Sequence, residues 1–236
     1  MRRILALISL LLVPLWAQAA SFQVSPIRIT LSADHSTDVI RVTNSSDTPT
    51  VVQLQIVAWA QENGDDVYTP SRNLLATPPI FTVAPGSQQV VRVGMRTHPD
   101  ARQETCYRLF LTEVPPAPTK EFRGVQIALR MGIPVFVDPL TATEPKLRWS
   151  GKLLSPSELQ VSATNTGNAH AQILNWQLQS PDQSRAWSQE SGSYVLPGAT
   201  HTWTLKLTSP LAANTPLEVI ADTDRGTRHA QLVLEK

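Results

Sequence analysis

The chain has 236 residues and a nearly balanced charge, with 20 lysines and arginines against 19 aspartates and glutamates. Its basic residues are scattered singly among serine, threonine and glutamine, so the basic stripe of a nucleic-acid-binding protein is absent and no nucleic-acid partner is expected. Cys106 is the only cysteine, which excludes an internal disulfide and leaves hydrophobic cores to stabilise the fold. The length suffices for two domains of about 100 residues each.

Residues 1–19 have the features of a signal peptide. Two arginines open the segment, an apolar run follows over residues 4–15, and Ala-Gln-Ala at 17–19 matches the small-x-small pattern of signal cleavage. A membrane anchor is the alternative, but the apolar run is short for a bilayer. We therefore expect an exported chain that begins near Ala20.

The rest of the sequence predicts β-strands almost throughout. The runs are short, rich in valine, isoleucine, threonine and aromatics, and bounded by serine, asparagine, aspartate, proline or glycine. No segment sustains a helical period over three turns. In the first half, strands are expected at 27–31, 38–44, 51–60, 88–95 and 107–114. Cys106, which has no histidine near it in sequence, is interpreted as a packed small hydrophobe rather than a catalytic thiol.

A weak internal repeat divides the chain. Residues 42–54 and 83–93 pair an asparagine-centred turn with a Pro-Gly turn, and residues 163–174 and 195–205 repeat this order. Such turns also occur by chance in β proteins. Read as a true repeat, the pattern predicts two immunoglobulin-like sandwiches. The domains are placed at 20–138 and 146–236, joined by the proline-containing linker 139–145.

The last strand of the first half is longer than its own domain requires. In the sequence GVQIALRMGIPVFVD, residues 124–138, apolar side chains occupy every second position. This row is either part of the domain's own core or a face that is lent to another molecule. Its members are Val125, Ile127, Leu129, Met131, Ile133, Val135 and Val137.

No catalytic, metal or cofactor site is expected. The five histidines are isolated in sequence, without the spacing that holds a metal ion. Neither a nucleophile elbow nor a phosphate-binding glycine loop occurs. The acidic pair Asp65-Asp66 lies in a hairpin-like run and is interpreted as part of a solvated turn. The sequence therefore favours a binding or structural protein over an enzyme.

Three segments together resemble the PapD-like periplasmic chaperones of pilus assembly. These are SPIRITLSADHSTDVIRVTN at 25–44, LLATPPIFTVAPGSQQVVRV at 74–93, and ETCYRLFLTEVPP with GVQIALRMGIPVF, which close the first domain. The resemblance implies two domains in a boomerang arrangement. It also implies a periplasmic protein that binds pilus subunits and delivers them to an outer-membrane usher.

In that family the last long strand of the first domain fills the open groove of a subunit that lacks a strand, which is β-augmentation. The resemblance places Val125, Ile127 and Leu129 at the donor positions, and Met131 continues the row. An exposed apolar row also invites self-association of the free protein. The same resemblance places Arg28 at the first of two basic residues that bind the subunit's terminal carboxylate; a plain surface arginine is the alternative.

The chain departs from the family at several positions. Pro134 replaces the second basic anchor, and Arg130, in the same phase, is a candidate substitute by parity. Phe110 stands where the family has asparagine. At the interface between domains, Glu113 and Asp222 match acidic family members, but Asp138 replaces their basic partner.

The competing hypothesis is an exported structural or adhesive sandwich, such as a pilus subunit. A subunit is expected to have an incomplete sandwich and usually a cysteine pair. This sequence has one cysteine and a complete set of expected strands, which favours the chaperone.

Overall fold

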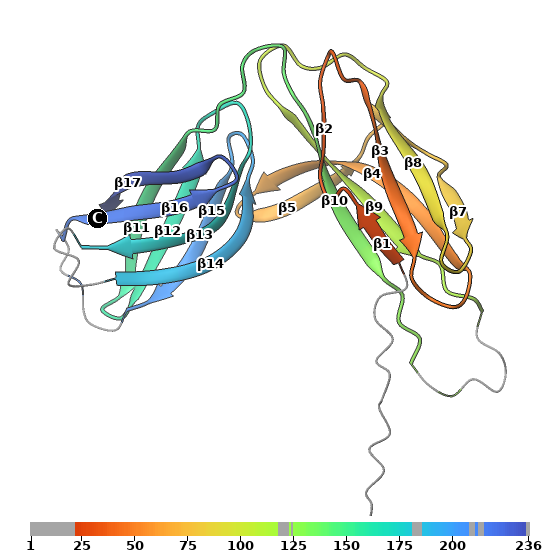
Figure 1. The fold of residues 1–236 in the computed structure, drawn as a ribbon. Helices are drawn as coiled ribbons and strands as arrows, with labels where there is room; N and C mark the ends of the chain where they lie inside the picture. Colours follow the sequence, from red (N-terminus) through yellow and green to blue (C-terminus); the bar gives the residue numbers. More distant parts are fainter. Residues whose placement is uncertain are drawn as a thin grey trace, which may run out of the picture.

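The computed structural model describes residues 22–117, 123, 125–180, 186–207, 211 and 215–234. The predicted signal peptide, residues 1–19, lies outside the described residues. All 17 elements found in the described part are strands, and none of these residues forms a helix that could cross a membrane. The prediction of an all-β chain with two sandwich domains is confirmed (Figure 1).

The first domain is a sandwich of two sheets. Four strands pair in the order β1 (Phe22–Ser25), β3 (Thr37–Asn44), β8 (Gln88–Met95) and β6 (Leu74–Thr77). The second sheet has the order β2 (Ile29–Leu31), β10 (Arg130–Val137), β9 (Thr105–Glu113), β4 (Thr50–Glu62) and β5 (Asp65–Pro70), and β7 (Ile80–Val83) also pairs with β4.

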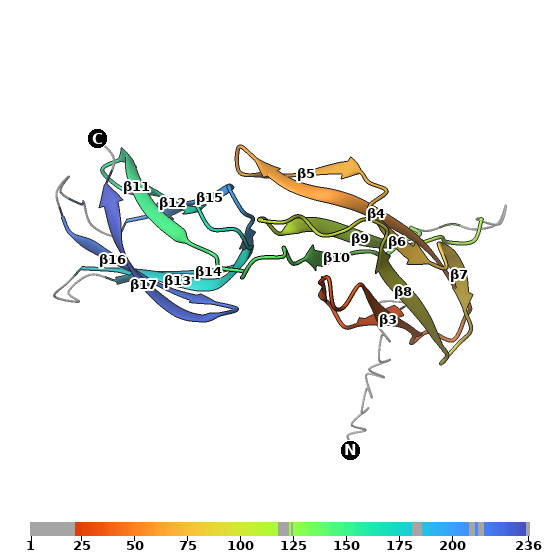
Figure 2. The same cartoon turned by 90° about the horizontal axis from the view of Figure 1, so that it is seen from above.

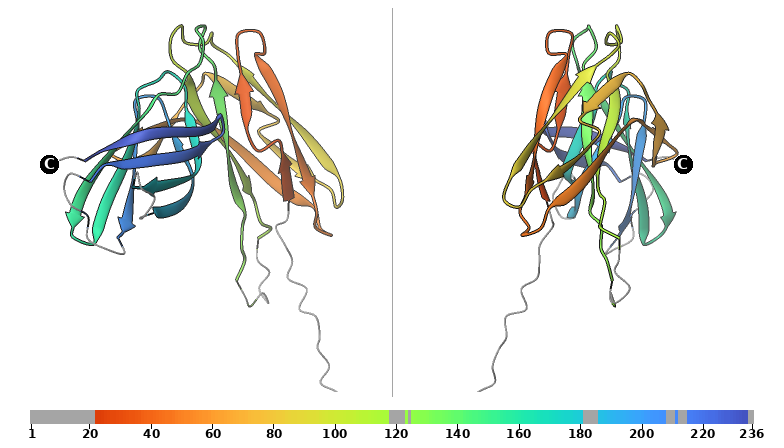
Figure 3. Two further views of the ribbon diagram at one scale, coloured as in Figure 1. Left: turned by 60° about the vertical axis from the view of Figure 1, so that its left-hand side comes forward. Right: turned by 90° about the vertical axis from the view of Figure 1, so that its right-hand side faces the viewer.

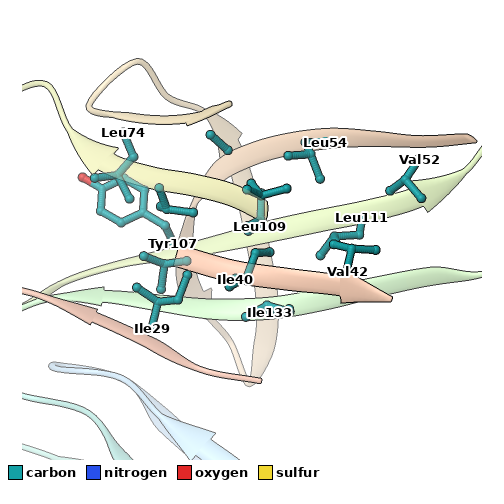
Figure 4. Close-up of a cluster of buried hydrophobic side chains, with 14 of the residues drawn as sticks. Ile29, Ile40, Val42, Val52, Leu54, Leu74, Tyr107, Leu109, Leu111 and Ile133 are labelled. Carbon is teal, nitrogen blue, oxygen red and sulfur yellow. The ribbon is translucent and has the colours of Figure 1, made fainter. Parts of the chain in front are cut away.

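The first core lies between these two sheets, where the alternate residues of each strand face inward. Ile40 on β3 lies opposite Leu109 on β9 and Ile133 on β10, and all three are buried (Figure 4). In the strand expected at 27–31, Ile27 and Ile29 should share one apolar face. Ile29 does face the core, but Ile27 does not. That side chain is 77% exposed because it precedes β2, which begins at Ile29.

The second domain is a seven-stranded arrangement that closes over its own core. The strand order is β14 (Ala186–Val195), β13 (Ala171–Gln179), β16 (Leu217–Thr223), β17 (Gly226–Leu234), β11 (Leu147–Ser155), β12 (Glu158–Asn165) and β15 (Thr200–Lys206). Figure 2 shows β11, β12 and β15 as one layer over β13, β14 and β16. Trp176 is fully buried between the layers.

The internal repeat is structural, because its two asparagines make the same bonds. The side-chain amides of Asn44 and Asn165 are fully buried. Each donates to the carbonyl four residues later at 2.7 Å. Each also donates, at 2.9 Å, to the carbonyl of the valine two residues before the proline of the Pro-Gly turn. In those turns Gly86 and Gly198 have φ values of 64° and 78°, which glycine adopts readily.

The two domains lie at an angle and meet at one end of each sandwich (Figures 1 and 3). Residues 138–146, between β10 and β11, carry no strand. An apolar cluster crosses the junction: Trp59, Cys106 and Phe136 from the first domain contact Leu196 and Ala199 from the second. Burial raises the pKa of the Cys106 thiol well above its usual value, so this thiol is a packed side chain and not a reactive one.

Candidate functional site

Strand β10 is a core strand over its second half. It pairs with β9 on one side along its full length, and with β2 on the other side only from Val135 to Val137. Ile133, Val135 and Val137 are at most 3% exposed and belong to the first core. Of the two alternatives for the row, the domain's own core therefore holds for these three residues.

The same row continues beyond the sandwich toward its N-terminal end. Leu129 and Met131 are half-buried at the edge of the core. Val125 and Ile127 are 87% and 84% exposed, and the described residues around them, 125–129, have no strand assignment. The segment extends past the end of the sheets in Figure 3. The row thus changes from core to free apolar surface within one stretch of chain.

Among the described residues, no strand pairs with one edge of β10 between Arg130 and Pro134, next to the exposed part of the row. On that side β2 contributes its first paired residue, Ile29, opposite Val135. Arg28 directly precedes Ile29, so it lies where the open edge of β10 ends. Because Ile29 faces the core, Arg28 points to the outer face, as its phase predicts. Its side chain is 42% exposed, and Nη1 donates to Oδ2 of Asp224 at 2.9 Å.

A second arginine flanks the position where the family's second basic anchor is missing. Pro134 is paired directly with Arg108 on β9, and directly opposed residues project from the same face. Arg28 precedes Ile29, the partner of Val135, just as Pro134 precedes Val135. Arg28 therefore extends the row of Arg108 and Pro134, which we call the basic row. The guanidinium carbon of Arg108 lies 3.8 Å from the ring centroid of Trp59. Its Nε is buried without a hydrogen-bond partner among the described residues.

Tyr194, from β14 of the second domain, lies between these two arginines. Burial raises the pKa of its hydroxyl, while the charges of Arg28 and Arg108 oppose that rise. Arg108 and Tyr194 line an open recess of about 340 Å³ whose lining also includes the acids Asp65 and Asp66. The recess is therefore of mixed charge, and an anionic group is favoured only on the side of Arg28 and Arg108.

Sequence reasoning missed Arg108, although its signal was present. In the run TCYRLFL, Tyr107, Leu109 and Leu111 face the core. That alternation alone places Arg108 on the outer face. What the sequence does not give is the register of β9 against β10, which brings Arg108 beside Pro134.

Arg130 does not take the place of the missing anchor. It is paired with Thr112 and lies four residues from Pro134, about 13 Å along the strand. Its guanidinium carbon lies 4.0 Å from the ring centroid of Phe110, which stands edge-on to Tyr68. The idea that Arg130 reaches the cleft is wrong, because its guanidinium is held on Phe110, at a distance from Arg28 and Pro134.

The predicted meeting of three acids at the junction is also wrong. Glu113 lies at the far end of β9, where its carboxylate accepts from the backbone of Leu129. Asp222 accepts from the hydroxyl of Thr227 at 2.6 Å. The acid that acts on Asp138 is Glu104: burial and the charge of Glu104 raise the pKa of the Asp138 carboxyl.

Asp138→Asn is expected to raise the melting temperature at neutral pH. A carboxyl with a raised pKa in the folded state holds its proton better there than in the unfolded chain, so stability falls as the pH rises through that interval. The difference between variant and wild type should shrink below about pH 4. Thermal unfolding at several pH values measures this, with the exposed Asp34→Asn as control. A lower melting temperature for Asp138→Asn at neutral pH would contradict it.

Comparison with known proteins places this geometry in a family. The model of the pili and flagellar-assembly chaperone, PapD N-terminal domain, matches residues 21–142. The chaperone protein FimB/FhaD of Bordetella pertussis is 28% identical over 135 residues, 52% of each chain. The uncharacterized fimbrial chaperone YhcA of Escherichia coli is 25% identical over 129 residues, 55% of this chain and 54% of its own. The match spans about half the length of these relatives.

Solved structures share the whole fold. A chain of the CsuC-CsuE chaperone-tip adhesion subunit pre-assembly complex of Acinetobacter baumannii matches with a TM-score of 0.68 at 17% identity, over 92% of this chain and 100% of that one. The YadV chaperone matches with a TM-score of 0.62 at 18% identity, over 90% and 100%. With the family model matched over more than half of its length, the chain belongs to the PapD family of pilus-assembly chaperones.

Proposed function

We propose that the protein is a periplasmic, non-enzymatic chaperone that binds pilus subunits by lending them the exposed apolar row that leads into β10. The observation that carries this is the apolar row that leaves the core at Leu129 and is free at Ile127 and Val125, beside an open strand edge. Such an edge is an aggregation hazard unless a partner covers it. A subunit that lacks one strand supplies both the groove and the backbone partners.

The basic row fixes where the bound subunit strand ends. A strand that pairs with the open edge of β10 and runs parallel to it reaches its last residue where β2 begins. There its terminal carboxylate meets Arg28 on one side of Pro134 and Arg108 on the other. Arginine suits a carboxylate because its planar donors bind both oxygens. Arg108 thus supplies the second charge that the proline cannot carry.

Magnitudes support a specific complex. Burial of each exposed aliphatic side chain contributes roughly 1.5–3 kcal/mol, and each charged hydrogen bond to the carboxylate about 1.5–3 kcal/mol. These gains offset the cost of ordering a subunit strand. Delivery to an outer-membrane usher and self-association of the free chaperone through Val125 and Ile127 belong to the same proposal.

Co-expression tests the function. A pilus subunit that lacks its last strand is produced in the periplasm with and without the chaperone, and soluble subunit is quantified after size-exclusion chromatography. We expect the subunit to co-elute with the chaperone and to be degraded or aggregated without it. Equal soluble subunit in both cultures, with no complex, would reject the proposal and leave the structural or adhesive alternative.

A further inference from the structure

A buried ionic contact joins the two domains next to the apolar cluster. Glu104, directly before β9, is 3% exposed. Nδ1 of His170, from the second domain, lies 2.8 and 2.9 Å from the two carboxylate oxygens of Glu104. The backbone N–H of His170 also donates to Glu104 at 3.0 Å. The imidazole stacks on Phe136 at a centroid distance of 3.5 Å. A carboxylate only accepts, so Nδ1 of His170 carries a proton.

The other ring nitrogen of His170 faces a second acid. Nε2 is buried without a hydrogen-bond partner among the described residues. Oδ2 of Asp224 lies 3.7 Å from this nitrogen. A bare lone pair there would face an anionic oxygen, whereas an N–H would be attracted to it. Only the doubly protonated ring presents an N–H to both Glu104 and Asp224.

Asp224 connects this contact to Arg28. It lies in the turn between β16 and β17, where Oδ1 accepts from the backbone N–H of Gln172 at 3.1 Å and Oδ2 accepts from Arg28 at 2.9 Å. Nη1 is the only Arg28 atom in this ion pair, and the side chain stays 42% exposed, so Asp224 orients the guanidinium and leaves room for a ligand.

The remaining ionisable groups around His170 come from three elements. Asp138, after β10, interacts electrostatically with the ring and with Arg225 of the β16–β17 turn. Tyr194, on β14, has its ring centroid 5.7 Å from the imidazole. Burial raises the pKa of the Tyr194 hydroxyl, so this group keeps its proton at neutral pH. The thiol of Cys106 also donates to Glu104 at 3.4 Å. The charge at Asp138 is removed in a control, because this carboxyl acts on the ring from the first domain.

We propose that His170 is a positioning residue for subunit binding: its protonated ring bridges Glu104 of the first domain and Asp224 of the second, and so holds both the angle between the domains and the guanidinium of Arg28. The inference rests on the proposed function, which makes Arg28 the carboxylate anchor. It adds that the anchor of the first domain is oriented by the second domain, through a buried histidine that contacts acids of both.

Two ligand-free readouts test this inference, so their outcome does not depend on whether Arg28 binds a subunit. Spin labels at Asp47→Cys and Lys152→Cys report the distance between the domains by double electron–electron resonance, while the buried Cys106 stays unlabelled. Phenylglyoxal modification, followed by mass spectrometry, reports how freely Arg28 reacts relative to the exposed Arg92 of the same sample.

Four variants separate the roles. His170→Phe keeps a ring to stack on Phe136 and removes both donors, and His170→Gln keeps a neutral donor and folds even if the phenylalanine variant does not. Asp224→Asn is the positive control for release of Arg28. His229→Gln is the matched control, because His229 also contacts a glutamate at 3.0 Å but is exposed. Each is measured again with Asp138→Asn.

At one neutral pH we expect the distance distribution to broaden, and the relative reactivity of Arg28 to rise severalfold, in His170→Phe. His170→Gln should show the same changes to a smaller degree, and His229→Gln should follow the wild type. The proposal is overturned if neither His170 variant broadens the distance distribution. It is equally overturned if neither His170 variant changes Arg28 while Asp224→Asn does.

Discussion

Replacement of both Val125 and Ile127 by threonine is expected to remove subunit protection and leave the free chaperone as stable as the wild type. Both side chains are more than 80% exposed, and exposed substitutions change stability by about 0.5 kcal/mol or less. In a complex the same side chains would be buried, so the loss of apolar area should weaken binding by about 2–4 kcal/mol, which is more than tenfold.

Two measurements decide whether the row is donated to a subunit or belongs to the domain's own core. They are thermal unfolding of the free protein and recovery of soluble subunit on co-expression. Ile133→Thr is the internal comparison, because Ile133 belongs to the same row but is 3% exposed and should lower the melting temperature clearly. Leu154→Thr with Val233→Thr removes exposed apolar area from the second domain and should leave recovery unchanged. Normal subunit recovery with the Val125 and Ile127 variant would exclude their donor role.

The alternation of apolar residues was enough to predict the strands and the sandwich class, because a sheet with one buried face imposes a period of two. It could not say where the long row leaves the core. The sequence of residues 124–138 is apolar at every second position throughout, yet Ile133 is buried and Ile127 is free. That difference depends on where β10 pairs with β9, from Arg130 onward, and on where the opposite sheet covers it, which are properties of the sandwich and not of the strand.

The sequence also could not predict contacts between segments that lie far apart in the chain. The repeated turns around Asn44 and Asn165 could be recognised because each is local. Arg108 beside Pro134 depends on strand register, and His170 against Glu104 depends on how two domains meet. Strand parity directed attention to Arg130, and the resemblance to a family directed it to Glu113, but both residues occupy other parts of the sheet.

Loss of both arginines in the basic row should abolish the preference for a free carboxylate. The probe is a short labelled peptide that alternates valine with threonine, prepared with either a carboxylate or an amide at its C-terminus. Wild-type protein should bind the carboxylate form more tightly in fluorescence anisotropy. Arg28→Gln and Arg108→Gln should each cost about 1.5–3 kcal/mol with that form, roughly tenfold or more, and little with the amide.

The double variant distinguishes one shared site from two separate ones. If both guanidiniums bind the same carboxylate, the two losses should be non-additive, as groups that contact a common partner are. Arg130→Gln is the matched control, because Arg130 lies on the same face of the same sheet but stacks on Phe110, and it should leave the carboxylate preference intact. If Arg108→Gln binds both peptides like the wild type while Arg130→Gln loses the preference, Arg130 and not Arg108 is the second anchor, and the row across Pro134 has no part in binding.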